Sequence, residues 1–312
     1  MSTVAPAIVA HALRKEYGPK VAVDALTLTV EPGEVFGFLG PNGAGKTTSI
    51  KMLLGLARPT SGSASLLGWP ISDPRSRARV GFLPEHFRFH EWLRADEFLD
   101  LHGRLHHLSP EVRRRRVDEL LELVGLSEAR TRRLGAFSKG MLQRIGLAQA
   151  LIHSPALVFL DEPTSGLDPL GRRLVRDIIR RLREEGTTVF INSHLLSEVE
   201  VTCTRVAFIT AGRVRLVTEL HGHVDGLLEV QLKVGQLDEG LVEGLKQWSS
   251  EVVVDAATCQ LTLHLPDESA LPAIARWIVG RGTELYRLAP RPLSLEDLFV
   301  RIVGEDTSWE VS

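Results

Sequence analysis

Short, almost wholly apolar runs recur along the first two thirds of the chain. Each run has four or five residues and ends at a glycine, a proline or a polar residue. Runs of this kind are typical of strands buried on both faces, as in a parallel sheet that helices cover. The predicted buried strands are residues 35–39, 80–83, 157–160 and 188–192.

Strands of a second kind are predicted before the first apolar run and after the last one. Residues 8–17 and 25–30 form the first such pair, and residues 25–30 alternate apolar residues with threonine. Residues 206–210 and 214–217 flank Ala211-Gly212-Arg213 and are expected to form a hairpin.

Apolar residues at helical spacing follow the first buried strand and then dominate residues 86–155. Ser109 and Pro110 suit the N-cap and the first turn of one of these helices. Because the helical block lies between two predicted buried strands, we expect a helical insertion in an α/β domain of residues 1–220. The expected helices are residues 47–56, 93–105, 110–124, and one that follows Met141 and ends near residue 152.

The remaining residues, 221–312, have a pattern of their own. The order strand, helix, strand, strand, helix, strand indicates a small ferredoxin-like α+β domain. A last, amphipathic helix over residues 294–303 is expected to dock its apolar face, which carries Leu295 and Leu298. The expected strands are residues 227–234, 251–254, 260–265 and 284–288, and the expected helices are residues 241–248 and 270–281.

Composition and charge exclude several classes of protein. A formal net charge of −2 over 312 residues gives no basic footprint, which argues against nucleic acid as the main partner. No apolar run approaches the ~20 residues needed to cross a bilayer, so a membrane role would depend on a partner. No leader pattern opens the chain, and the separated Cys203 and Cys259 are expected to be reduced thiols of a cytosolic protein.

The junction between the first buried strand and the next helix carries the most specific motif. It fits G-x-x-x-x-G-K-[ST], in which glycines let backbone N–H groups wrap a polyphosphate. Lys46 places a positive charge at the β- and γ-phosphates, Thr47 offers a hydroxyl to Mg²⁺, and the helix N-terminus faces the anion. The nucleotide-binding residues expected here are Gly40, Pro41, Asn42, Gly43, Ala44, Gly45, Lys46, Thr47 and Thr48.

Polar side chains also follow two other buried strands. Asp161 and Glu162 come after residues 157–160, and His194 comes after residues 188–192. In open α/β sheets, ligands bind at the edge formed by the carboxyl ends of the strands, where these side chains are expected. Because adjacent strand residues point to opposite sides, one carboxylate can hold a metal while the next turns toward the nucleophile.

These motifs, in this order, resemble those of the ATP-binding subunit of an ABC transporter, and the resemblance covers about residues 8–217. It is carried by the phosphate loop, Asp161-Glu162, His194 and the stretch Phe137-Ser138-Lys139-Gly140-Met141. The resemblance implies an α/β, phosphate-loop ABC ATPase core with an antiparallel β subdomain and a helical subdomain. The ferredoxin-like domain would follow this core as an accessory domain.

The resemblance also implies roles for single residues. Asp161 is expected to hold Mg²⁺ through its water shell, Glu162 to polarise the attacking water, and His194 to contact the γ-phosphate. Tyr17 occupies the place of the adenine-stacking aromatic, although an aromatic residue beside a turn more often simply packs. Residues 165–168 resemble a loop that communicates across a dimer.

Two features depart from the family pattern. The family signature is usually Leu-Ser-Gly-Gly-Gln, whereas Lys139 and Met141 stand at its third and fifth positions. Ser138 and Gly140 are kept and are expected to close over an ATP bound to a second copy of the chain. Glu85 stands where a glutamine normally contacts the metal, and we expect it still to bind Mg²⁺, with altered coupling to the membrane subunit.

The resemblance therefore implies an ATPase that uses ATP and Mg²⁺, pairs with itself or with a homologous subunit, and does not act on nucleic acid. It would drive a separate integral-membrane permease, for export, from the cytoplasmic face of the cell membrane. The alternative is a soluble ATPase of this family that acts on nucleic acid or the ribosome, but such chains tend to carry two cassettes or a long coiled coil. A silent nucleotide sensor is a third interpretation, which Glu85 leaves open.

Overall fold

The chain folds as two compact units in a computed structural model. One unit comprises Met1–Thr218 with Ile302–Ser312, and the other comprises Glu219–Arg301. We call them the cassette and the accessory unit and describe each by itself. The structure describes residues 5–86, 89–220, 228–249, 252–291 and 295–307.

A six-stranded sheet forms the centre of the cassette, in the order β10-β9-β3-β8-β7-β6. The pairs β3/β8, β3/β9, β7/β8 and β6/β7 are parallel. Every residue of β3, β7 and β8 is buried, which confirms the prediction made from the apolar runs. The strands are β3 (Val35–Leu39), β6 (Val80–Leu83), β7 (Leu157–Asp161), β8 (Thr188–Asn192), β9 (Arg205–Thr210) and β10 (Arg213–Glu219).

The turn between β9 and β10 explains how the predicted hairpin closes. Ala211 and Gly212 connect the two strands, and both have positive φ values, 46° and 77°. Two successive residues of positive φ are the requirement of a type I′ turn, whose twist matches that of the flanking strands.

A four-stranded antiparallel sheet packs beside the central one, in the order β2-β1-β4-β5. The first pair was predicted, but β4 and β5 were not, because Ser61 to Ser65 are small and polar and have weak strand propensity. Pairing with β1, from Ile8 opposite Leu66 onward, overrides that local preference. The strands are β1 (Ile8–Tyr17), β2 (Lys20–Val30), β4 (Ser61–Leu66) and β5 (Trp69–Pro70).

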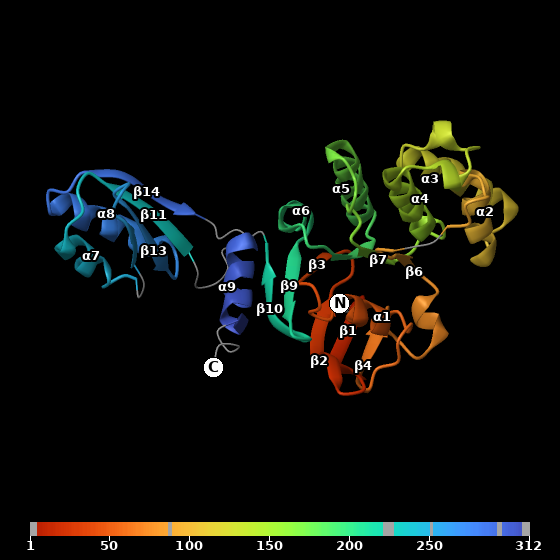
Figure 1. The fold of residues 1–312 in the computed structure, drawn as a ribbon, viewed down its shortest axis with the longest axis horizontal. Coiled ribbons are helices and arrows are strands. Elements are labelled where there is room, and N and C mark those ends of the chain that lie inside the picture. Colours follow the sequence, from red (N-terminus) through yellow and green to blue (C-terminus); the bar gives the residue numbers. More distant parts are fainter. Residues whose placement is uncertain (1–4, 87–88, 221–227, 250–251, 292–294, 308–312) are drawn as a thin grey trace. The chain divides into compact units, whose positions relative to one another are not determined.

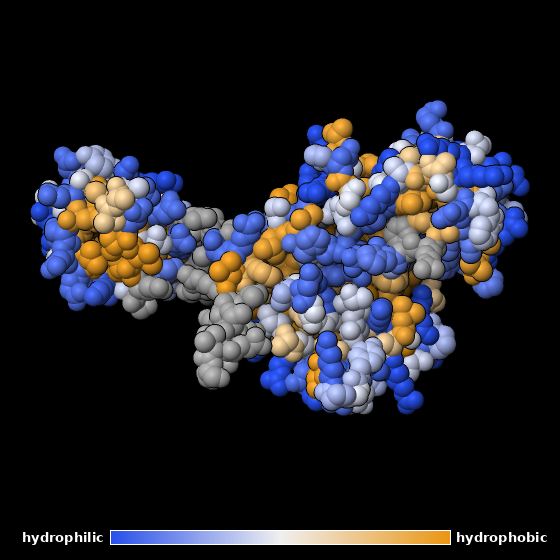
Figure 2. Space-filling view, in the orientation of Figure 1, coloured by the Kyte–Doolittle hydropathy of each residue, from blue (hydrophilic) through white to orange (hydrophobic). Residues whose placement is uncertain are grey.

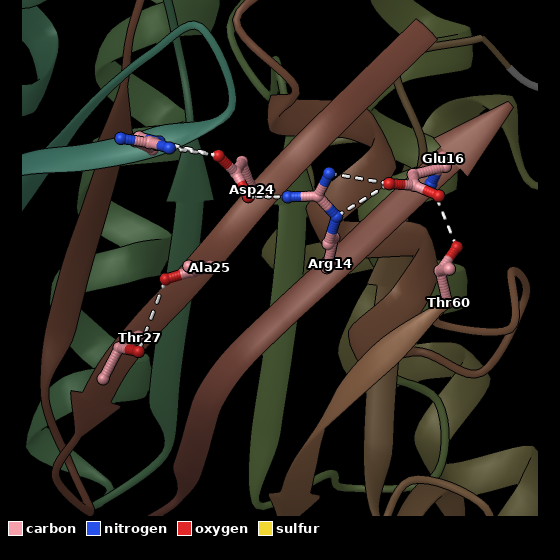
Figure 3. Close-up of polar contacts among 7 residues, drawn as sticks. Arg14, Glu16, Asp24, Ala25, Thr27 and Thr60 are labelled. Atoms are coloured by element: carbon pink, nitrogen blue, oxygen red, sulfur yellow. Dashed lines mark hydrogen bonds and ion pairs between the residues drawn. The ribbon is translucent and has the colours of Figure 1, made fainter. Parts of the chain in front are cut away.

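A polar network joins this antiparallel sheet to β10 (Figure 3). Asp24 of β2 forms an ion pair with Arg14 of β1 and accepts a 2.8 Å hydrogen bond from Arg213 Nε. Arg14 Nε in turn donates to Glu16 at 2.8 Å. The hydrogen bond from Arg213 is the main reason why the pKa of Asp24 lies below its ordinary value.

Among the described residues of the cassette, α2, α3 and α4 gather into one helical group that contacts β6 through α4, whereas α1, α5 and α6 pack on the strands (Figure 1). Ser109 caps α3 as predicted, by accepting from Val112 N. The helix α5 was not predicted, although Val175, Ile178 and Leu182 are buried at helical spacing. The helices are α1 (Lys46–Leu53), α2 (Ala95–Leu105), α3 (Pro110–Leu123), α4 (Lys139–Leu151), α5 (Pro169–Glu184) and α6 (Leu196–Thr202).

Short 3₁₀ turns complete the cassette. They are η1 (Pro74–Arg77), η2 (Ser127–Ala129) and η3 (Leu134–Ala136). Asp73 caps η1 by accepting from Arg75 N. No helix among the described residues is long and apolar enough to span a membrane.

The accessory unit has the predicted strand and helix order and an antiparallel sheet in the order β12-β13-β11-β14. This is the ferredoxin-like arrangement, and α7 and α8 pack on its buried apolar face. The elements are β11 (Leu228–Val234), α7 (Glu239–Leu245), β12 (Val252–Asp255), β13 (Gln260–Leu265), η4 (Glu268–Ala270), α8 (Leu271–Gly280) and β14 (Leu285–Arg291).

Several predicted ends of this unit lie outside the described residues: Leu227, Glu251 and Ser294. The final helix is present as α9 (Leu295–Thr307), and Leu295 and Leu298 of its first turns are buried. The face of the accessory unit seen in Figure 2 gathers hydrophobic residues into one patch, surrounded by hydrophilic ones.

Aromatic side chains lie at the centre of the cassette core. The ring of Phe190, in β8, lies 5.7 Å from that of Phe36, 5.4 Å from that of Phe38 and 5.2 Å from that of Phe159. All four side chains are fully buried. Phe190 therefore contacts both neighbouring strands, and its removal would leave a cavity that they cannot easily fill.

Phe190→Ala should lower the free energy of unfolding of the cassette by about 3–5 kcal/mol. Urea unfolding followed by circular dichroism, with one transition fitted for each unit, measures the change in this free energy. Leu56→Ala is the control, because Leu56 is 65% exposed and its loss should change that free energy by less than about 0.5 kcal/mol. Equal effects of the two substitutions would contradict this account of the core.

Candidate functional site

The loop between β3 and α1 is packed so closely that two of its glycines, Gly40 and Gly45, are required. A Cβ on Gly40 would lie 2.1 Å from the carbonyl oxygen of Ile209, and one on Gly45 would lie 2.4 Å from that of Ala22. Gly45 also has φ of 100°, a left-handed conformation that favours glycine. The loop is thus held between β2 and the end of β9.

Lys46 begins α1 and turns back over this loop. Its Nζ donates hydrogen bonds to the carbonyl oxygens of Gly40, at 2.6 Å, and Pro41, at 3.1 Å. Burial lowers the pKa of Lys46, and the nearby carboxylates of Glu162, Asp161 and Glu85 oppose that effect. The structure therefore brings together the lysine and all three of the acidic residues named from the sequence.

Asp161 ends β7 as a buried carboxylate. It is 2% exposed, and its Oδ1 accepts a 2.5 Å hydrogen bond from Asn192 Nδ2. Asp161 and Asn192 are register partners in the parallel pair β7/β8, so both strands place a polar group at the same edge. Burial is the main cause that raises the pKa of Asp161, and the hydrogen bond from Asn192 opposes it.

Glu162 follows in a strained conformation and points to a different partner. Its φ of 53° lies in the left-handed region, which costs a residue other than glycine of order 1–3 kcal/mol. Its Oε2 lies 2.8 Å from Nδ1 of His194, an ion-pair distance when the imidazole is protonated. Burial raises the pKa of Glu162, whereas His194 lowers it.

The oxygen-bearing groups of the site suit Mg²⁺ bound together with a polyphosphate. The exposed Thr47 hydroxyl, the buried Asp161 carboxylate and the exposed Glu85 carboxylate are hard oxygen donors, as Mg²⁺ prefers. Among the described residues, no group of three or more His, Cys, Asp or Glu could hold a metal ion alone. In proteins, Mg²⁺ is usually held by one or two protein groups together with water and substrate phosphates.

The signature stretch occupies the N-terminus of α4. Ser138 is the N-cap, and its side chain accepts from Met141 N at 3.3 Å. Lys139 extends its side chain across Gly166, where a Cβ would lie 2.6 Å from Lys139 Cε. Gly140 lies beside Leu167, with 3.3 Å between a Cβ built on it and Leu167 Cδ2. The signature and residues 165–168 are therefore in contact within one chain.

Tyr17 and residues 165–168 have local contacts that the sequence did not predict. Tyr17 is 51% exposed at the end of β1, and Lys15 Nζ lies 4.9 Å from the centre of its ring. Its exposed ring is free of the packing role that is usual for an aromatic residue. Asp168 caps α5, because its Oδ1 accepts a 2.7 Å hydrogen bond from Gly171 N.

Two residues of the site were missed in the sequence. Asn192 precedes Ser193-His194 at the end of an apolar strand, and the signal was its position level with Asp161 in a neighbouring strand. Gln143 was missed although it is a polar residue within the apolar pattern of α4. Its side-chain amide is buried and donates to the carbonyl oxygens of Glu162 and Pro163, each at 3.1 Å.

The fold and the site together define a class of protein. A parallel sheet delivers a phosphate loop, two carboxylates and a histidine to one region, and a separate helical group carries a capping serine. This is the arrangement of a phosphate-loop ATPase, which binds a nucleoside triphosphate by its phosphates and directs water at the last of them.

Comparison with known proteins narrows the class to one family. Residues 23–165 match the model of the ABC transporter family. A 48% identical relative, an uncharacterised ABC transporter ATP-binding protein of Nostoc sp., aligns over 92% of this chain and 85% of its own length. The Nod factor export ATP-binding protein I of Cupriavidus metallidurans is 36% identical over 94% of this chain and 96% of its own.

A solved structure agrees with these relatives. A dimeric ATP-binding cassette in a post-hydrolysis state, bound to ADP and Pi, has a TM-score of 0.64 and 25% identity. It covers 69% of this chain, and this chain covers 99% of that one. The chain belongs to the ATP-binding subunits of ABC transporters, which bind and hydrolyse ATP.

The buried carboxylate of Asp161 yields a stability prediction. Asp161→Asn should raise the melting temperature of the nucleotide-free protein, because it removes a buried charge while an amide oxygen can still accept from Asn192. Each kcal/mol gained corresponds to about 2–4 °C for a domain of this size. Differential scanning calorimetry measures the shift.

Asp177→Asn is the matched control, since Asp177 lies on the exposed face of α5 with half of its side chain in solvent. Its exposed ion pairs contribute little, so the melting temperature should stay within about 1 °C. A lower melting temperature for Asp161→Asn would show that the charge itself stabilises the nucleotide-free site.

Proposed function

We propose that this chain is the ATP-hydrolysing subunit of an exporter, in which two copies close around two ATP molecules and drive a separate integral-membrane permease. The observation that carries the proposal is the arrangement at the ends of the neighbouring strands β3, β8 and β7: Lys46 lies over the phosphate loop, and the buried Glu162 lies 2.8 Å from His194. Lys46 and the phosphate loop suit the triphosphate, and the buried Glu162 suits the water that attacks it.

The roles of the single residues follow from their positions. Glu162 is 6% exposed and lies at ion-pair distance from His194, so it can hold and polarise a water while the imidazole contacts the γ-phosphate. Lys46 can exchange its hydrogen bonds to loop carbonyls for phosphate oxygens. Tyr17 presents an exposed ring for stacking on adenine.

Mg²⁺ is the expected cofactor. Thr47 and Asp161 would hold it with the β- and γ-phosphates, and Glu85 would add a third oxygen. When bound, the ion offsets the negative charge of the phosphates and of the carboxylates around Lys46. Glu85 in place of a glutamine adds negative charge and loses a hydrogen-bond donor, which would alter the coupling of this position to the membrane subunit.

The second copy completes the site. Ser138 at the N-cap of α4, with Gly140 behind it, would contact the γ-phosphate of ATP on the partner copy, so that ATP binding closes the dimer and hydrolysis opens it. Export is supported by the relative whose name includes Nod factor export, which this chain matches over nearly its full length. The subunit would then work at the cytoplasmic face of the cell membrane, through its permease.

Glu162→Gln tests the catalytic role. We expect ATP affinity to be kept and kcat to fall by roughly 10²- to 10⁴-fold, the range for the loss of a positioned base. The variant should also accumulate as an ATP-bound dimer, detected by size-exclusion chromatography with light scattering. Wild-type turnover in this variant would remove Glu162 from the mechanism.

Lys46→Ala provides the contrast, because it removes a charge that binds the substrate itself. It should weaken ATP binding measured by calorimetry, and it should not form the dimer even at high ATP. If both variants bound ATP equally well, the proposed division between a binding and a catalytic residue would be wrong.

The proposed association with an integral-membrane permease is tested by co-purification and reconstitution. The full-length wild-type chain, purified from detergent-solubilised membranes of its host, should carry an integral-membrane protein with several apolar spans. In proteoliposomes that protein should change the ATPase rate of the wild type and not that of Glu162→Gln. Recovery of ribosomes or nucleic acid, with no membrane protein, would favour the soluble alternative.

A further inference from the structure

Glu162 occupies a backbone conformation that its surroundings must enforce. Its φ of 53° is unfavourable for a residue with a side chain, and such conformations persist only where other contacts hold them. Two backbone bonds do so locally: Glu162 N donates to Asn192 O at 2.8 Å, and Ser165 N donates to Glu162 O at 3.1 Å. Neither bond reaches the helical group of the cassette.

A third contact comes from α4. The Nε2 of Gln143 donates to Glu162 O and to Pro163 O, both at 3.1 Å. Gln143 is 5% exposed, and the other buried residues of α4, which is described throughout, are apolar or glycine. Among the described residues, Pro163 O accepts no other hydrogen bond for which the structure gives a donor.

The geometry points to a specific task for this amide. We propose that Gln143 is a positioning residue, which fixes the Glu162–Pro163 peptide and so holds the Glu162 carboxylate where it directs the attacking water. This inference rests on the proposed role of Glu162. One amide bridges two successive carbonyl oxygens, so it restrains the rotation of the peptide that follows the strained residue, which a single hydrogen bond would not do.

A purely structural role makes a different prediction. If Gln143 only satisfied two buried carbonyl oxygens, its removal would lower stability and leave catalysis per folded molecule unchanged. If it positions Glu162, its removal reduces kcat, because small displacements of a catalytic group are costly. A measurement of kcat therefore distinguishes the structural role from the positioning role, whereas a melting temperature does not.

Gln143→Met is the test variant, because methionine keeps the length and shape of glutamine and has no N–H donor. We expect kcat to fall about 10- to 100-fold, and the dissociation constant for ATP to stay within about twofold of the wild-type value. Single-turnover hydrolysis and calorimetric titration with ATP in the presence of Mg²⁺ measure the two quantities.

Gln149→Met is the matched control on the same helix. Gln149 is half-buried, and its side chain has no hydrogen bond with any other residue that the structure describes. The same substitution there should leave kcat unchanged within about twofold. Loss of activity in both variants would indicate a general defect of α4 and would overturn the proposal.

A double-mutant cycle with Glu162→Gln decides whether Gln143 acts through Glu162. In the Glu162→Gln background, Gln143→Met should change the residual rate by less than about twofold, because the group that it positions is already disabled. Independent, multiplicative losses would overturn the inference and leave the role of Glu162 intact. Wild-type turnover of Glu162→Gln alone would instead contradict the proposed function, so the two failures are distinguishable.

Discussion

The structure depends on the burial of two adjacent carboxylates at the edge of a parallel sheet. Asp161 is the last residue of β7 and Glu162 follows it. Both side chains are buried, and burial raises the pKa of both. A buried carboxylate is costly unless hydrogen bonds or opposite charges replace its hydration. Asn192, His194 and Lys46 supply part of that replacement. The site is therefore poised to gain from a bound cation.

The parallel sheet makes this convergence possible. β3, β8 and β7 are neighbouring parallel strands. The sheet therefore brings three segments that lie far apart in the chain to one edge: the phosphate loop, residues 192–194, and the pair Asp161 and Glu162. The interior of the sheet is largely apolar, and Phe190 contacts rings from both adjacent strands. Rigid strands place catalytic groups more precisely than free loops do.

The departures from the family pattern have local physical consequences. The side chain of Lys139 lies against Gly166, while Ser138 is the N-cap of α4, so the lysine contacts the loop of residues 165–168 and leaves the cap in place. Glu85 is exposed, yet its charge raises the pKa of both Asp161 and Glu162. It therefore adds negative charge to the site, which a glutamine would not do.

The sequence by itself determined the buried parallel strands, the phosphate loop, the order of the motifs and the ferredoxin-like pattern, because apolar periodicity and glycine placement are local signals. It missed β4 because that strand forms by pairing with β1 against its own weak propensity. Only the tertiary structure decided that Asn192 meets Asp161, that Glu162 is strained, and that Gln143 reaches its carbonyl oxygen. Those contacts join residues 19 and 31 positions apart, and no local pattern encodes them.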